Sequence, residues 1–200
     1  MNFTKHEKII IIVNIIGALF FTMLFIIRSN YEFIIYIFVL GAIMSLIIGT
    51  HKIFKYSVGV LWALTIWSFA HLVGGGLEYA PGEVFYKLMI LPIIGEPYSI
   101  LKYDQIVHFY GFWVSGIVMY YILKPSLVGA IVNKRSVIFV IVMASLGLGA
   151  VNEIVEFGAT VAVPDTNVGG YVNTALDLVS DLLGALGAGI YLRYKYFKNN

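Results

Sequence analysis

The chain has 200 residues, of which 60% are hydrophobic and 12% are charged, and its mean hydropathy is +0.90. So few charged residues cannot cover a globular surface, which excludes an ordinary soluble domain and indicates a helical membrane protein. The absence of cysteine excludes disulfides, thiolate metal sites and covalently attached haem.

Six apolar segments follow one another along the chain, each with the length and composition expected of a membrane-spanning helix. They lie at about residues 9–27, 33–48, 58–73, 106–123, 137–157 and 176–191. The last helix is expected to begin near Thr174, because Thr174 and Asp177 have the spacing of a capping box. We therefore predict an all-α, polytopic transmembrane bundle that forms a single domain over residues 1–200.

The longest connection runs from Gly74 to Tyr103 and contains a shorter apolar stretch at residues 84–94. Eleven residues with Pro92 near their end are too few to cross ~30 Å of hydrocarbon as a helix. We expect an interfacial or re-entrant segment here, between the third and fourth spans. The glycines at 74–76 are candidates for its hinge.

Basic residues are concentrated on one side of this predicted topology. Ten of the 13 lie at the N-terminus, after the second and fourth spans, or at the C-terminus: Lys5, Lys8, Lys52, Lys55, Lys124, Lys134, Arg135, Arg193, Lys195 and Lys198. The positive-inside rule then predicts a multi-pass protein of the cytoplasmic (inner) membrane with both termini in the cytoplasm. All acidic residues except Glu7 lie on or near the opposite side, which that rule does not require.

Several of these acids occur with histidine at helical spacing near the outer end of the spans. The spacings of three or four residues place each pair on one helix face, and all members fall within about two turns of the outer boundary. The pairs are Asp104 with His108, Glu153 with Glu156, and Asp177 with Asp181. With His71 at the outer end of the third span, four helices are therefore expected to bring carboxylates and imidazoles to the same depth.

Five carboxylates in a half-buried site cannot all be ionised without protons or a bound cation to balance them. We expect a divalent metal ion, namely Zn, Mn, Fe or Mg. The predicted metal ligands are His108, Glu153, Glu156, Asp177 and Asp181. The predicted catalytic residues are Asp104, His108, Glu153 and Glu156, with Asp104 as a base or in the outer shell of the metal.

Some residues near this site also fit simpler structural roles. Asp104 and Asp177 stand where a helix cap is also expected, since each lies at the start of a span. His71 and Glu78, around the end of the third span, are candidate additional members of the site, although a solitary histidine at the membrane boundary can simply snorkel.

Four motifs resemble the YjdF-like predicted inner-membrane proteins. They are His71-Leu72-Val73-Gly74-Gly75, Tyr103-Asp104-Gln105-Ile106-Val107-His108-Phe109, Asn152-Glu153-Ile154-Val155-Glu156-Phe157, and Asp177 to Ala185 with its Asp-x-x-x-Asp and Gly-Ala. The Asp-x-x-x-His-Phe, Glu and late Asp pattern is more distantly similar to VanZ-like proteins, which are associated with the bacterial envelope. The resemblance implies a membrane architecture and this set of site residues, but adds little about the reaction.

The function expected from these observations is that of a metal-dependent hydrolase or transferase acting on a membrane lipid or lipid-linked envelope substrate. Two alternatives stay open. One is a cation- or proton-coupled transporter in which the carboxylates titrate, and the other is a non-enzymatic envelope or regulatory protein. Nothing in the sequence suggests nucleic-acid binding.

Overall fold

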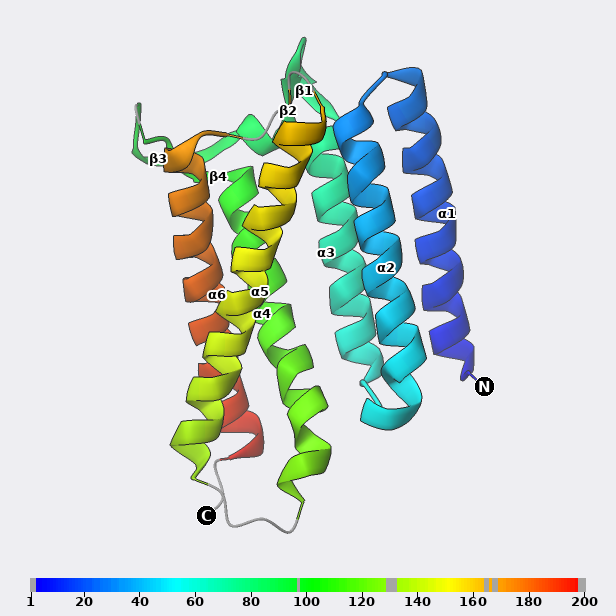
Figure 1. The fold of residues 1–200 in the computed structure, drawn as a ribbon, viewed down its shortest axis with the longest axis vertical. Helices are drawn as coiled ribbons and strands as arrows, with labels where there is room; N and C mark the ends of the chain where they lie inside the picture. Colours follow the sequence, from blue (N-terminus) through cyan, green and yellow to red (C-terminus); the bar gives the residue numbers. More distant parts are fainter. Residues whose placement is uncertain (1–2, 97, 129–132, 164–165, 167–168, 198–200) are drawn as a thin grey trace.

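The computed structural model describes residues 3–96, 98–128, 133–163, 166 and 169–197, and this part of the chain is a bundle of six helices long and apolar enough to cross a membrane (Figure 1). The helices are α1 (Lys5–Ile27), α2 (Tyr31–Phe54), α3 (Val58–Gly76), α4 (Tyr103–Leu123), α5 (Lys134–Ala162) and α6 (Tyr171–Tyr196). Helices α1 to α3 form one half of the bundle, α4 to α6 form the other, and α3 packs on α4 between them. The prediction of an all-α polytopic bundle is confirmed.

The helices extend beyond the apolar segments because polar residues cap them. Thr4 forms a capping box with Glu7 at the start of α1, while Asn30 and Ser57 cap α2 and α3 with their side chains. The prediction that the last helix begins near Thr174 is wrong. Helix α6 begins at Tyr171 after Gly170, and the carboxylate of Asp177 accepts a hydrogen bond from the side chain of Asn173 instead of capping the helix.

The connection between α3 and α4 is extended and lies across the end of the bundle (Figure 1). Strands β1 (Glu78–Ala80) and β2 (Glu83–Val84) form one antiparallel pair, and β3 (Met89–Ile94) and β4 (Ile100–Lys102) form another. Between the pairs is the short 3-10 helix η1 (Phe85–Lys87), and a second one, η2 (Lys124–Leu127), follows α4. Of the two predicted alternatives, an interfacial or a re-entrant segment, this position agrees with the interfacial one.

The glycines at 74–76 do not form a flexible hinge between α3 and this connection. They are the last residues of α3 and are buried. A Cβ atom at Gly75 would overlap the ring of Phe33, and one at Gly74 would overlap the ring of Tyr86. The glycines are therefore explained by close packing of aromatic rings on the end of α3.

The outward face of the bundle is apolar. Large side chains such as Leu19, Phe38, Phe139 and Ile154 are exposed by 64–74%. A soluble protein does not expose so many contiguous apolar side chains, whereas in a bilayer lipid tails cover them. The exposure pattern agrees with six helices that are surrounded by lipid.

The interior contains two apolar clusters. One fills the half of the bundle nearer the termini and includes Leu64, Val114, Ile141 and Leu192, which are less than 9% exposed. The other joins α1, α2, α3 and α5 near the opposite end through Phe21, Phe25, Phe33, Tyr36, Leu72 and Ala159. Polar side chains beyond these clusters form bonds between helices, as when Ser145 of α5 donates to the carbonyl of Phe112 in α4 at 2.7 Å.

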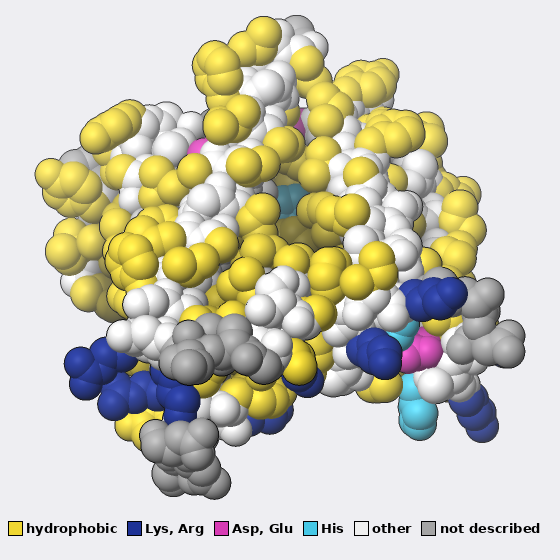
Figure 2. Space-filling model, turned by 60° about the horizontal axis from the view of Figure 1, so that its bottom comes forward, with side chains coloured by type: hydrophobic (Ala, Val, Ile, Leu, Met, Phe, Trp, Pro, Cys, Tyr) yellow, Lys and Arg dark blue, Asp and Glu magenta, His cyan; other side chains and the backbone are white. Residues whose placement is uncertain are grey.

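Charge is separated along the long axis of the molecule. The end that carries both termini gathers Lys and Arg side chains, and apolar side chains cover the flanks above it (Figure 2). Glu7 also lies at this end, where its carboxylate contacts His51 at 3.0 Å. Asp165 and Lys198, which contribute to the charge asymmetry of the sequence, lie outside the described residues.

Candidate functional site

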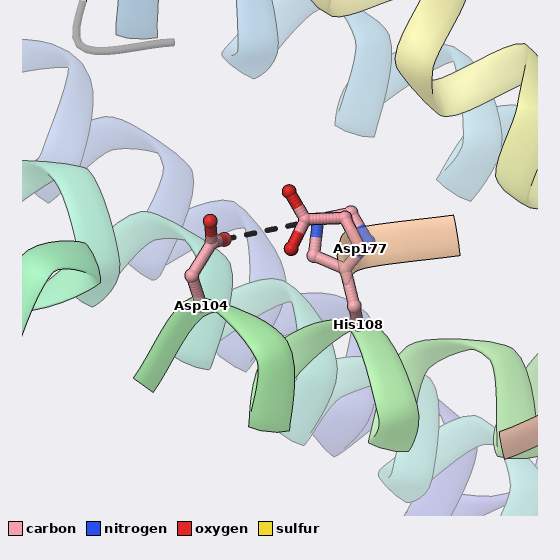
Figure 3. Close-up of side chains that lie close together, drawn as sticks. All are labelled: Asp104, His108 and Asp177. Carbon is pink, nitrogen blue, oxygen red and sulfur yellow. Dashed lines mark ion pairs between the residues drawn. The ribbon is translucent and has the colours of Figure 1, made fainter. Parts of the chain in front are cut away.

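His108 lies in the second turn of α4, at the point where α4, α5 and α6 meet near the end opposite the termini. Asp104 stands one turn before it on the same face, and Asp177 approaches both from α6 (Figure 3). Glu153 and Glu156 of α5 and Asp181 of α6 complete the group. We call these six residues the carboxylate–histidine cluster.

The two nitrogens of the His108 ring face different carboxylates. Nδ1 lies 2.9 Å from Oδ1 of Asp181, which is a hydrogen bond, and 3.9 Å from Oε1 of Glu153. Nε2 lies 3.7 Å from Oδ1 of Asp104 and 3.9 Å from Oε1 of Glu156, which are ion-pair distances without a hydrogen bond. Nδ1 is therefore fixed by a hydrogen bond, whereas Nε2 faces two carboxylate oxygens without a hydrogen bond to either.

The cluster is buried, and several of its oxygens have no partner. Asp177 and Asp181 are fully buried and His108 is 6% exposed. Among the described residues, no hydrogen bond reaches Oδ1 of Asp177, Oδ2 of Asp181 or either carboxylate oxygen of Glu153. No Lys or Arg of the described chain forms an ion pair with the cluster. Buried carboxylates without partners cost several kcal/mol, so the cluster needs bound protons or a cation.

Two asparagine side chains fix other oxygens of the cluster. Asn173 donates from Nδ2 to Oδ2 of Asp104 at 3.3 Å and to Oδ2 of Asp177 at 2.5 Å, so it connects α4 and α6. Asn152 donates to Oε1 of Glu156 at 2.9 Å along α5. Asn173 was not expected at the site, although its spacing of four residues from Asp177 places both side chains on one face of α6.

Small residues let the three helices approach closely enough to form the cluster. A Cβ atom at Gly149 of α5 would lie 2.3 Å from Oδ2 of Asp181. A Cβ atom at Gly184 of α6 would lie 2.1 Å from the carbonyl oxygen of Phe109 in α4. Glycine is therefore required at both positions, and the backbone of α6 lies directly on that of α4 beside His108.

The donor set fits a divalent metal ion. Ligand atoms of Asp104, His108 and Asp177 lie within 4.8 Å of one another, and so do those of His108, Glu153 and Glu156. Carboxylate oxygen with imidazole nitrogen is the donor set that Zn, Mn and Fe prefer, and Mg takes carboxylates. The unpartnered buried oxygens are a second, independent reason for a cation at this place.

His71 and Glu78, the two candidate additional members of the site, lie in different surroundings in the structure. His71 of α3 is buried, and its Nδ1 lies 2.5 Å from the hydroxyl of Tyr86 in η1, which also donates to the carbonyl of His71 at 3.0 Å. Glu78 does not join the cluster, because it lies in β1 and pairs with Arg28 at 3.5 Å. Burial, followed by the nearby carboxylates of Asp104 and Glu156, raises the pKa of Tyr86 well above its ordinary value.

A small cavity of about 30 Å³ connects His71 and Tyr86 with the cluster. Its walls also include Asp104, Glu156 and Asn173. A polar space of this size holds one or two water molecules. Tyr86 was not expected at the site, because it lies in an apolar stretch whose path across the end of the bundle cannot be read from spacing.

Comparison with known families shows to which family the chain belongs. Residues 9–199 match the family model described as predicted membrane protein, DUF2238. The chain belongs to this family. This family corresponds to the YjdF-like proteins that the sequence motifs resemble. No comparison supports the more distant similarity to VanZ-like proteins. No curated protein and no solved structure matches the chain, so no function is transferred from a relative to this DUF2238 member.

Proposed function

We propose that this DUF2238 protein holds a divalent metal ion in the carboxylate–histidine cluster and is a hydrolase or transferase for a lipid or lipid-linked substrate. The observation that carries the proposal is the arrangement around His108. Nδ1 is bonded to Asp181 at 2.9 Å, and Nε2 faces the carboxylates of Asp104 and Glu156. A metal-bound histidine commonly donates its other N–H to a carboxylate, which fixes the tautomer and the direction of the ring.

This geometry divides the roles within the cluster. His108 through Nε2, with Asp104, Glu156 and Asp177, would hold the ion, while Asp181 orients the imidazole and is not a ligand. We assign the role of proton acceptor to Glu153, because its Oε1 lies 3.9 Å from Nδ1 of His108 and it is not needed among these ligands. The metal would supply Lewis acidity that activates water and polarises a phosphoryl or acyl group.

The buried core favours an enzyme over a transporter. The cluster and its cavity are confined to one end of the bundle, while the other half is filled by the apolar cluster around Val114, Ile117, Ile141 and Leu192. Ions or protons crossing the membrane need polar groups or water along the path. A substrate that stays at the membrane boundary needs only the polar end, and lipid head groups lie at that depth.

The orientation follows from charge. The end with both termini carries most Lys and Arg side chains, so we place it in the cytoplasm by the positive-inside rule (Figure 2). The carboxylate–histidine cluster then opens toward the outer leaflet of the cytoplasmic membrane. A substrate of the cell envelope is the compound class available on that side.

The test is the metal content of the detergent-purified protein, measured by mass spectrometry. We expect about one metal ion per chain in the wild type and loss of it in His108→Ala and in the double variant Glu153→Gln/Glu156→Gln. The variant Asp181→Asn should retain the site with an affinity about 10- to 100-fold lower, as for other partners of a metal-bound histidine. Glu83→Gln is the control, because Glu83 pairs with Lys87 outside the cluster.

Metal-free wild type with variants of equal stability would overturn the proposal and favour protonated carboxylates, the arrangement expected of a transporter. Ion flux into proteoliposomes that is lost in Glu156→Gln would then be the decisive result. If the metal is present, lipid extracts incubated with wild type and His108→Ala should differ in products by mass spectrometry. Identical lipid profiles would support a non-enzymatic metal protein.

A further inference from the structure

The two hairpins at the end of the bundle opposite the termini differ in their surface chemistry. The β1–β2 hairpin carries an acidic residue on each strand, Glu78 and Glu83. The β3–β4 hairpin, residues 89–102, has Lys102 at its base, and Glu96 is its only other charged residue. The first hairpin therefore suits water, whereas the second is almost entirely apolar.

Large apolar side chains of the β3–β4 hairpin are exposed on both faces. Leu91 and Ile93 are exposed by 56% and 61%, and Ile90 and Ile94 by 46% and 49%. Successive residues of a strand point to opposite faces, so Ile93 and Ile94 together expose both. Strand β3 pairs with β4, and within the described chain no helix covers β3 to a comparable extent. A two-stranded hairpin with this surface is at best marginally stable in water.

The position of the hairpin indicates what covers these side chains. In Figure 1 the β3–β4 hairpin projects sideways past the bundle, and β4 leads directly into α4. In the first two turns of α4, Ile106 and Phe109 are exposed by 38% and 43% and continue the lipid-facing surface of the helices. The apolar surface of the hairpin joins this surface at the level where α4 begins, which is the boundary between lipid head groups and hydrocarbon.

We propose that the β3–β4 hairpin is a membrane anchor that inserts Leu91 and Ile93 into the lipid leaflet beside the carboxylate–histidine cluster. The free edge of a two-stranded pair carries N–H and C=O groups that hydrocarbon cannot satisfy, so the backbone stays among the head groups. The apolar side chains then reach about 5–10 Å into the boundary with the acyl chains. Tyr98, which is 53% exposed, has the side chain that favours this interface.

Anchoring of the hairpin fixes the start of α4 relative to the lipid surface. The side chain of Gln105 accepts a hydrogen bond from the N–H of Leu101 at 2.6 Å, and the N–H of Tyr103 donates to the carbonyl of Leu88 at 2.9 Å. Asp104 of the cluster stands between Tyr103 and Gln105. The anchor therefore holds the cluster at a set depth below the head groups, and it does so whether or not the cluster binds a metal.

The test uses single cysteines in the full-length protein, which has none of its own. Leu91→Cys and Ile93→Cys are labelled with a nitroxide, and the protein is reconstituted into phosphatidylcholine vesicles. Electron paramagnetic resonance then measures collisions of the label with oxygen, which concentrates in hydrocarbon, and with a water-soluble nickel chelate. Leu19→Cys, on the exposed side of α1, is the reference for lipid, and Tyr79→Cys on β1 is the reference for water.

Both hairpin labels should resemble the label at Leu19→Cys. The ratio of oxygen to nickel collisions is expected to be severalfold higher than at Tyr79→Cys. Hairpin labels that resemble Tyr79→Cys would place the hairpin in water and overturn the proposal. Labels that collide with neither reagent would show that protein covers the hairpin, as a second copy of the chain would, and would also overturn it.

A double variant tests whether the apolar side chains cause the insertion. Leu91→Ser/Ile93→Ser should raise the nickel collisions of a label at Ile90→Cys severalfold, whereas Tyr79→Ser should leave them unchanged. Nickel collisions that do not rise would overturn the role assigned to Leu91 and Ile93. The double variant should keep the metal content of the wild type, because neither side chain belongs to the cluster, so a failure of the anchor and a failure of the proposed metal site are measured separately.

Discussion

At the scale of single residues, the proposed chemistry depends on how the side chain of His108 is held. A histidine surrounded by carboxylates has several possible orientations, and the bond from Nδ1 to Asp181 selects one of them. The position of the Asp181 side chain depends on its close packing against the backbone of Gly149, which has no side chain. A residue without a side chain therefore determines the direction of the ring that carries the proposed chemistry.

The variant Gly149→Ala tests this dependence. The new methyl group would lie 2.3 Å from Oδ2 of Asp181, so the carboxylate must move away from His108. We expect a loss of about tenfold or more in metal affinity, measured by competition with a chelator. Gly147→Ala in the same helix is the control, because its added carbon meets nothing within 4 Å, and it should stabilise the helix by about 0.5–1 kcal/mol. Equal affinities in the two variants would contradict the prediction.

At the scale of elements, α4 and α6 pack backbone to backbone. Lipid tails are as apolar as leucine, so helices in a bilayer associate through close van der Waals contact at small residues. Here Gly184 lies against the backbone of Phe109 and Trp113, and Gly116 lies against Ala188. This contact sets the spacing that lets Asp177 and Asp181 reach His108.

The variant Gly184→Ala should therefore destabilise the bundle. The added carbon would meet the carbonyl oxygen of Phe109 at 2.1 Å, and neither backbone can yield as a flexible side chain could. We expect a loss of about 1–3 kcal/mol in stability, read from the unfolding midpoint in detergent. Gly41→Ala in α2, where an added carbon meets nothing within 4 Å, should cause no loss. A stable Gly184→Ala protein would show that α4 and α6 can separate without cost.

The connection between α3 and α4 is anchored by Tyr86. Its hydroxyl satisfies both Nδ1 and the carbonyl of buried His71. The variant Tyr86→Phe leaves these groups unsatisfied and should cost about 1–3 kcal/mol at neutral pH. Tyr79→Phe is the control, because Tyr79 is 42% exposed and forms no hydrogen bond with a described residue through its hydroxyl.

The same pair of variants has an expected pH dependence. Burial raises the pKa of Tyr86 above its ordinary value of 10.0, so the folded protein keeps a proton that the unfolded chain releases above that pH. The contribution of Tyr86 is complete below pH 10.0 and declines as the pH rises toward the folded pKa. The stability difference between wild type and Tyr86→Phe should therefore shrink above pH 10.0, and a constant difference would contradict the assigned burial.

At the scale of the whole molecule, the candidate site lies at one end of the bundle. The carboxylate–histidine cluster and its cavity lie opposite the termini, and the end with the termini carries most of the basic residues (Figure 2). For the proposed enzyme, the orientation of this end in the membrane decides which compartment supplies the substrate.

Labelling of single cysteines tests the orientation directly, because the chain has none of its own. Tyr79→Cys, on exposed β1, should react with a membrane-impermeant maleimide in intact cells. Lys52→Cys, near the end of α2, should react only after the membrane is opened. The reverse pattern would place the cluster in the cytoplasm and would exclude a substrate of the outer leaflet.

The sequence alone determined the number of long apolar helices, because apolar length fixes membrane-spanning helices whatever their neighbours. It did not determine the two strand pairs between α3 and α4. It also indicated that Asp104, His108, Glu153, Glu156, Asp177 and Asp181 face one level of the bundle, since helical spacing and depth follow from counting residues. The resemblance seen in the four motifs corresponds to the family that the comparison found.

Only the tertiary structure decided how these residues are arranged. Spacing cannot tell which nitrogen of His108 meets Asp181, that Asn173 bridges Asp104 and Asp177, or that Tyr86 reaches His71 while Glu78 turns away to Arg28. Each of these contacts joins segments far apart in the chain. They depend on how closely the helices pack, and that distance is set by glycines such as Gly149 and Gly184, whose partners lie on other helices.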